Sequence, residues 1–384
     1  MTVNPSVNSK TQIDVAKSGY RPQISGGLNT GIDILNGARW QPRAQASLSQ
    51  MVHDFGKTAS AVDAARAGTQ VSRAQLLQAV DTLIRNTVYA VIETQRYHAL
   101  LIVAQKQLAS IARIDALVRL RTQKGASTRS DAVQAEARVQ GAQAAIMDIT
   151  GQLDRWRSNL AFLTGADGPV DTLTDVPDWF DQSCAPVEPD WMEVPAILQM
   201  QARREEAAAT LRGANANRLP SISVGADMLS NLRDPVARDS EMIVGLRLSS
   251  SIFDGGANRA RRAAADYAVR SADAALGSAR NEVGRSLQES REQISAYRSQ
   301  LDILSSREGM MEETGKLYSL QYLQMGTRTL LDLLNAQQEL YQVQFDYANA
   351  RHDIRRLNAD CLFSSGRTRE AFVLSGTTLR GVTL

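Results

Sequence analysis

The chain has 384 residues, of which 43% are hydrophobic but only 5% aromatic, so its apolar side chains are mostly small. The formal net charge of +2 gives no electrostatic argument for nucleic acid or for an anionic membrane surface as a partner, and we expect no nucleic acid. The longest uninterrupted apolar run, Ala99 to Ala104, falls far short of the roughly 20 residues of a membrane-spanning helix, which argues against a helical membrane protein.

The sequence contains two copies of one plan. Three short motifs occur in the same order in each half, roughly 200 residues apart, which is unlikely to arise by chance. The matching pairs are Arg21–Ser25 with Leu219–Ser223, Asp54–Gly56 with Asp254–Gly256, and Gly125–Asp131 with Gly326–Asp332.

Each copy begins with alternating hydrophobicity, the pattern of a two-faced strand. In the first copy Ile24, Leu28 and Ile32 alternate with polar or small residues, and a second strand follows a turn at Asn36-Gly37. The second copy repeats this pattern around Val224 and Leu246. The sequence therefore predicts four strands in two hairpins.

Four strands cannot close on themselves, since small barrels need about eight. Each predicted strand has about the length that crosses a bilayer in a tilted β-barrel. An isolated hairpin of this kind is more often half of a soluble sandwich, but no further strands are predicted that could form the second sheet. Closure would then require other copies of the chain.

Long helices follow each hairpin. The first runs from Gly56 to about Arg121, breaks at Gly125 and returns over 130–163. The second runs from Ala257 to about Tyr322, breaks at Gly326 and returns over 330–362. Apolar residues near Leu76 recur every three or four positions, as in a coiled coil. A solvated cytosolic coiled coil explains the helices equally well.

The predicted fold is mainly α-helical with a β portion, divided by a proline-rich connector. The tail is expected to lie against the level of the connector or to be disordered. In chain order we predict an N-terminal helix (1–20), β-hairpin 1 (21–55), helical hairpin 1 (56–164, tip near 122–130), the connector (165–195), a helix (196–217), β-hairpin 2 (218–254), helical hairpin 2 (255–362, tip near 323–330) and the tail (363–384).

This combination resembles the TolC-like outer-membrane factors, the exit ducts of tripartite efflux and type I secretion systems. The resemblance covers essentially the whole chain and is most specific over Met325–Ala336. Further matches are Tyr20–Gln23, Ser47–Gly56 and Ile252–Gly256. The Tyr20–Gln23 opening and Gly366-Arg367 look more like type I secretion ducts than like drug-efflux ducts.

The resemblance implies a homotrimer in the outer membrane, with a 12-stranded β-barrel continued by a periplasmic α-helical tunnel. Its implied partners are the lipid bilayer, a periplasmic adaptor, and an inner-membrane ABC or proton-driven pump. It implies no cofactor. The implied substrates are proteins or small molecules.

Site residues follow from the same resemblance. Arg328, Asp332 and Asp131 match residues that gate the periplasmic constriction, although Asn335 stands where the family has an acid and Leu323 where it has a tyrosine. The expected adaptor-docking tips are Gly125, Thr128, Gly326 and Thr329. The expected lumen-facing residues are Gln23, Ser25, Asn29, Asp33 and Arg247, and the expected lipid-facing ones are Ile24, Leu28, Ile32, Val244 and Leu246.

The two cysteines, Cys184 and Cys361, are expected at the same level of the tunnel. In an oxidising periplasm they could pair, provided that their Cα atoms lie within about 7 Å; two inert buried thiols are the alternative. Without a CxxC spacing, and with three scattered histidines, the sequence predicts no metal site.

Other functional classes have weaker support. Asp54-Phe55-Gly56 spells a kinase metal-binding triplet, and Gly56-Lys57-Thr58 ends like a phosphate loop, but the remaining parts of both motifs are missing, so we expect no enzyme. A soluble coiled-coil scaffold is the serious alternative, since it would need no export signal and none precedes Pro5. The first helix also looks about two turns short, which indicates either a wrong start or a real deletion. A scaffold would leave the β-hairpins unexplained.

Overall fold

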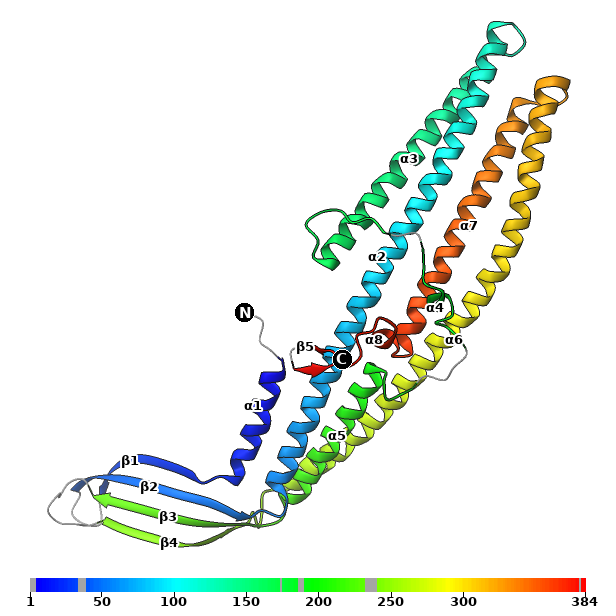
Figure 1. The fold of residues 1–384 in the computed structure, drawn as a ribbon. Helices are drawn as coiled ribbons and strands as arrows, with labels where there is room; N and C mark the ends of the chain where they lie inside the picture. The colour runs from blue at the N-terminus through cyan, green and yellow to red at the C-terminus, as the bar shows by residue number, and fades with distance from the viewer. Residues whose placement is uncertain (1–4, 34–38, 173–174, 186–189, 232–239, 380) are drawn as a thin grey trace. The chain divides into compact units, whose positions relative to one another are not determined.

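The computed structural model describes residues 5–33, 39–172, 175–185, 190–231, 240–379 and 381–384 (Figure 1). Contacts within the chain divide it into two compact units. Unit 1 comprises residues 1–78, 195–281 and 374–384, and unit 2 comprises residues 79–194 and 282–373. The long helices α2 (Lys57–Gln123) and α6 (Ala257–Leu320) each contribute to both.

Unit 1 is built around a four-stranded antiparallel sheet in the order β1-β2-β3-β4. Its strands are β1 (Gln23–Asp33), β2 (Arg39–His53), β3 (Ser221–Asn231) and β4 (Ser240–Ser249). Helix α1 (Pro5–Lys17) and a 3-10 turn, Ser18–Tyr20, precede β1, and α5 (Pro195–Ala216) precedes β3. The two copies therefore join through the central pair β2 and β3.

The corner between strand and long helix is built the same way in both copies. Asp54 accepts hydrogen bonds from the backbone N–H of Gly56 (3.0 Å) and Thr58 (2.6 Å). Asp254 accepts from Gly256 (3.1 Å) and Asn258 (2.8 Å). Each aspartate thus satisfies N–H groups that the first helical turn leaves unpaired. The Asp54–Gly56 motif is therefore a helix cap.

Unit 2 contains two helical hairpins and the connector. The upper part of α2 returns as α3 (Arg129–Thr164), and α6 passes through a π-helical turn, Gln321–Met325, before returning as α7 (Leu330–Ser364). One core cluster lies near the tips and includes Val118, Ala135 and Leu334. Another joins α6 and α7 through residues such as Leu304 and Val343.

The connector and tail add small elements that the sequence analysis did not predict. The connector contains a single helical turn, α4 (Asp178–Asp181), and the tail forms α8 (Thr368–Ala371) and a hairpin of β5 (Thr378–Leu379) with β6 (Val382–Thr383). The expectation of only four strands is corrected by this hairpin, whose two-residue strands are too short to show alternation. Among the described residues no helix is long and apolar enough to span a membrane.

Candidate channel wall and gate

One face of the four-stranded sheet is polar. The strand register places Gln23, Ser25 and Asn29 of β1 on the same face as Arg247 of β4. Side chains on this face bind one another across strands: Ser25 pairs with Ser47 (2.7 Å), Asn29 donates to Gln45 (3.4 Å), and Arg247 forms an ion pair with Asp227 (2.6 Å). These cross-strand bonds make the face suited to water, although the register also places Leu229 and Ile243 on it.

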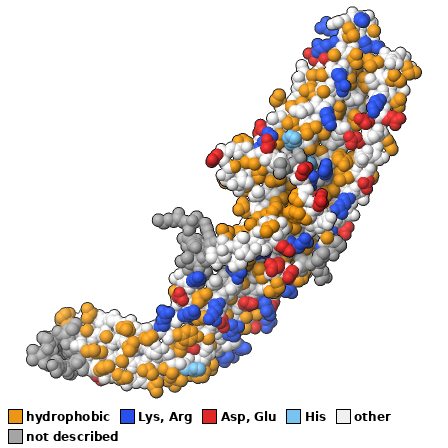
Figure 2. Space-filling model, viewed as in Figure 1, with side chains coloured by type: hydrophobic (Ala, Val, Ile, Leu, Met, Phe, Trp, Pro, Cys, Tyr) orange, Lys and Arg blue, Asp and Glu red, His pale blue; other side chains and the backbone are white. Residues whose placement is uncertain are grey.

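The opposite face is apolar and uncovered. Ile24, Leu48, Ala226 and Val244 form one row directly across all four strands. Ile24, Leu28, Val244 and Leu246 keep 63% to 81% of their surface exposed. Figure 2 shows the hydrophobic side chains gathered over the sheet. The side chains of Ile32 and Asp33, predicted for the two faces, lie outside the described part of the chain.

Both edges of the sheet are also open within the chain. Among the described residues β1 pairs only with β2, and β4 pairs only with β3. An exposed edge presents a row of unpaired backbone N–H and C=O groups, and an open apolar face loses the free energy of burial. The sheet of one chain therefore leaves backbone groups unpaired at its edges and apolar side chains exposed on one face.

The tip of the first helical hairpin is a compact capped turn. Gly125 adopts a left-handed conformation (φ 72°) that ends α2, and Thr128 caps α3. The Thr128 hydroxyl accepts from the N–H of Asp131 (3.2 Å), while the Asp131 carboxylate accepts from the N–H of Thr128 (3.1 Å) and the Ser127 hydroxyl (2.8 Å). The Ser127 bond, with those from Thr128, outweighs partial burial and lowers the pKa of Asp131.

The second tip repeats this construction. Gly326 is left-handed (φ 64°), and Thr329 and Asp332 form the same capping box with two bonds of 3.2 Å. The Asp332 carboxylate accepts from the backbone N–H of Thr329 and from the Thr329 hydroxyl (2.9 Å), and these two bonds lower the pKa of Asp332. Gly125, Thr128, Gly326 and Thr329 are all exposed. The four tip residues named from the sequence are thus accessible positions in two equivalent turns.

Arg328 is held by its own hairpin. Its guanidinium lies 3.9 Å from the Asp332 carboxylate, donates to Gln321 (3.3 Å) and stacks 4.4 Å from the centre of the Tyr318 ring. Among the described residues Arg328 forms no ion pair with Asp131, which is engaged in the first tip. The structure thus brings Arg328 to Asp332 and leaves Asp131 apart within one chain.

The two tips meet at Arg121 and Tyr322, which the sequence analysis did not assign to the gate. Arg121 donates to the carbonyls of Leu323 and Ala126 (both 3.4 Å) and lies 5.0 Å from the centre of the Tyr322 ring. Tyr322 is buried among the tip core residues. The aromatic residue that the family pattern places at Leu323 is thus one position earlier, where the π-helical turn directs it inward. The sequence signal for this contact was the position of Arg121, four residues before Gly125, where a long basic side chain can reach the carbonyl groups of the turn.

The first part of the tail belongs to unit 2 and is held there by a buried ion pair. The Arg369 Nε lies 3.2 Å from the Asp81 carboxylate, and both side chains are almost fully buried. Arg369 also donates to the Glu193 carbonyl (2.7 Å). Burial raises the pKa of Asp81 to about 6, partly offset by the Arg369 charge.

The two cysteines of the chain form a disulfide. It joins Cys184 of the connector to Cys361 near the end of α7, with Cα atoms 5.2 Å apart.

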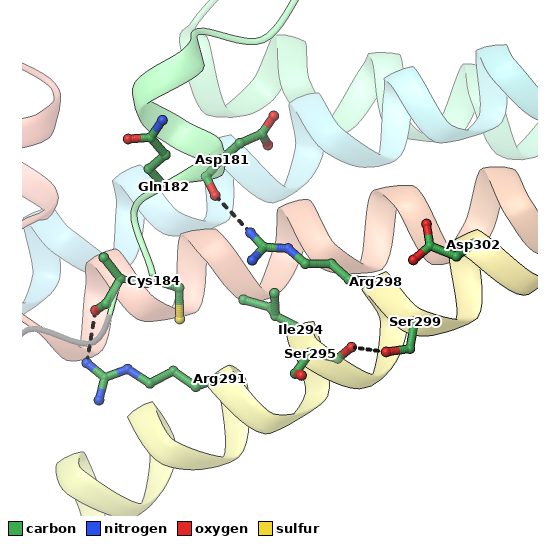
Figure 3. A pocket seen from close by; sticks show the side chains of 10 residues that line it. Asp181, Gln182, Cys184, Arg291, Ile294, Ser295, Arg298, Ser299 and Asp302 are labelled. Carbon is green, nitrogen blue, oxygen red and sulfur yellow. Dashed lines mark hydrogen bonds between the residues drawn. The ribbon is translucent and has the colours of Figure 1, made fainter.

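A cleft of about 570 Å³ lies between the connector and α6 (Figure 3). Arg291 donates to the Ala185 carbonyl (3.2 Å) and Arg298 to the Asp181 carbonyl (3.4 Å). These two bonds hold the connector against α6 on either side of the cleft. No group of three potential metal-ligating side chains occurs among the residues that the structure describes.

Comparison with known proteins identifies the family. The sequence profile described as "Outer membrane efflux protein" matches residues 8–166 and 193–360. The chain belongs to the outer membrane efflux protein family. It is 26% identical over 370 residues to the outer membrane efflux protein BepC of Brucella suis, covering 92% of this chain and 79% of BepC.

Solved structures share the fold of this family member. The outer membrane protein VceC of Vibrio cholerae superposes with a TM-score of 0.81 at 16% identity, covering 94% of this chain and 91% of VceC. The outer membrane channel MtrE of Neisseria gonorrhoeae, crystallised in its open state, gives 0.73 at 20% identity, covering 94% and 84%. The shared fold agrees with the family match, and it is membership of the outer membrane efflux protein family that makes the chain an outer-membrane efflux channel rather than an enzyme or a soluble scaffold.

Proposed function

We propose that three copies of this chain form one 12-stranded β-barrel in the outer membrane, continued by a helical tunnel in the periplasm. The observation that carries this proposal is the sheet with two open edges, one polar face and one exposed apolar face. Three such sheets joined edge to edge supply the closure that one chain lacks and match the even-numbered, polar-lined barrels of outer membranes.

The sheet faces then have distinct roles. Gln23, Ser25, Asn29, Asp33 and Arg247 line the water-filled lumen, and Ile24, Leu28, Ile32, Val244 and Leu246 contact lipid. The channel lowers the barrier to export by providing a wet path across the hydrocarbon layer. It consumes no energy itself, so an inner-membrane ABC or proton-driven pump must drive transport through a periplasmic adaptor.

The helix tips form the gate and the adaptor-docking surface. Gly125, Thr128, Gly326 and Thr329 are the exposed tip positions available to an adaptor. Opening is a change between two packings of the tip helices, in which the pairs of Arg328 with Asp332, and with Asp131 across a subunit boundary, favour the closed one. Export through a type I secretion system is the finer assignment, supported only by the Tyr20–Gln23 and Gly366-Arg367 motifs.

Single-channel conductance in a planar bilayer tests this function. The purified chain is expected to give discrete openings, and Arg328→Ser should raise the open probability, because it removes the Asp332 and Gln321 contacts in every copy. Each exposed pair contributes only ~0 to 1 kcal/mol, so the threefold repetition decides the size of the effect. Arg307→Ser, at an exposed arginine of α6 outside the tip, is the matched control. Absence of any conductance would contradict the channel proposal, and equal behaviour of the two variants would contradict the gate assignment alone.

A further inference from the structure

The start of α6 carries three exposed arginines, Arg259, Arg261 and Arg262. Among the described residues none of them has an ion pair, and the one side-chain bond they make is from Arg261 to Asn258 (3.2 Å). Their charges are therefore not neutralised by the part of the chain that the structure describes.

The stability of α6 does not account for these arginines. The N-terminal end of a helix carries a partial positive charge, so cations there are unfavourable, and the first turn of α6 contains no acidic residue. Asp254, just before the helix, is occupied by the N–H groups of Gly256 and Asn258. The Asp254 carboxylate offsets part of the positive charge at this end, and the three arginines add further positive charge that no acidic residue of the first turn balances.

The first copy shows that the repeat does not require arginine here. At the equivalent corner α2 carries Ala59, Ala61 and Val62, and Val62 is buried. Both corners have the same aspartate cap and positive-φ glycine. The arginines are thus specific to the second corner, which adjoins the open edge strand β4.

Their position relative to the sheet indicates the kind of anion. Leu246 and Leu248 of β4 lie on the apolar face, and Ile252 and Phe253 follow with 97% and 89% of their surface exposed. The arginines come within ten residues of Phe253, and Figure 2 shows Lys and Arg gathered where the helices of unit 1 meet the hydrophobic sheet. This succession of apolar, interfacial and basic side chains matches hydrocarbon, interface and headgroup layers.

We propose that Arg259, Arg261 and Arg262 bind the phosphate groups of anionic phospholipids, with Ile252 and Phe253 inserted at the boundary of the acyl chains. Guanidinium groups suit this ligand because they bind phosphate oxygens in a bidentate manner. The site rests on the proposed function, since it requires the sheet to cross the bilayer with this corner at the periplasmic leaflet.

Native mass spectrometry of the detergent-purified full chain tests the site with phosphatidylglycerol and phosphatidylcholine as probes. The wild type is expected to retain phosphatidylglycerol preferentially. The triple variant R259A/R261A/R262A should bind phosphatidylglycerol about tenfold more weakly and phosphatidylcholine unchanged, because three charges near an anionic headgroup are lost. R259K/R261K/R262K should lose less of the preference than the alanine variant, because the charges remain and only the bidentate geometry is lost.

The control variant R203A/R280A/R307A removes three exposed arginines elsewhere on α5 and α6, so it loses the same charge. Equal weakening in both alanine variants, or none in either, would overturn the site. Displacement of the bound lipid by millimolar inorganic phosphate would show a general anion site and overturn the lipid assignment. A monomeric mass in every sample would instead contradict the proposed trimer, while a trimer without lipid preference would contradict only this inference.

Discussion

The sheet of unit 1 and the helix tips of unit 2 differ in how far one chain can stabilise them. At the tips Leu330, Leu333 and Leu334 are buried in a core that the chain completes itself, and both turns have capping boxes. In the sheet, both edges are open and the apolar face is exposed. The tips are thus folded locally, and the contrast supports the proposal that the sheet depends on assembly and on lipid.

The largest expected effect is on the apolar face of the sheet. Leu28→Arg should abolish heat-resistant trimers in the outer-membrane fraction, because each buried arginine on a lipid face costs about 2 to 4 kcal/mol near the bilayer midplane and three copies carry it. Asn29→Arg, the adjacent residue on the polar face, should still assemble. Equal yields of heat-resistant trimer from the two variants would contradict the assignment of one face to lipid and the other to the lumen.

At the tips a core truncation should act locally. Leu334→Ala removes a side chain that is 2% exposed and should cost about 2 to 5 kcal/mol of local stability. Hydrogen exchange is expected to quicken around 114–135 and 318–334 while trimer yield stays unchanged. Leu331→Ala, at a half-exposed neighbour, should change exchange little. Loss of the trimer in Leu334→Ala would show that the tips are not independent of the sheet.

Two buried groups of unit 2 should respond to acid in opposite directions. Burial raises the pKa of Asp81 to about 6, so the folded state gains protons, and relative stability, as the pH falls from about 7 to 4. Burial lowers the pKa of His352 to about 4, so the folded state loses relative stability as the pH falls from about 6.5 to 4.

Melting temperatures measured from pH 7 to 4.5 check these signs. Asp81→Asn removes the acid-favoured contribution, so its melting temperature should fall more steeply with acid than that of the wild type. His352→Gln should fall less steeply. Parallel pH profiles for the wild type and both variants would show that neither group titrates in this range.

The smallest effect is expected at the capping boxes. Thr329→Ala removes the acceptor for the Asp332 N–H and should cost about 1 kcal/mol, seen as faster exchange in the first turn of α7. Thr329→Ser, which keeps the hydroxyl, is the control. Because the folded pKa of Asp332 lies below its ordinary value, the carboxylate's contribution should persist at pH 5 and disappear only as the pH falls below about 4. An unchanged exchange rate in Thr329→Ala would show that the cap does not hold this turn.

The features that sequence could predict are the periodic ones. Alternation over Gln23–Asp33 specifies the two sheet faces because successive strand residues point to opposite sides, and glycines at 125 and 326 specify the turns because they favour positive φ. The Asp81–Arg369 pair joins residues far apart in sequence, and neither residue belongs to a repeating pattern that would indicate the contact. The inward placement of Tyr322 depends on a local π-helical turn. Neither contact follows from a repeating pattern, so each required the structure.

The mass of the detergent-solubilised protein tests the central claim most directly, since that claim is that one sheet cannot close and three copies share a barrel. Light scattering corrected for bound detergent is predicted to give three times the mass of the chain, and the complex should persist without cross-linking. A stable species with the mass of one chain, its four-stranded sheet intact, would contradict the account.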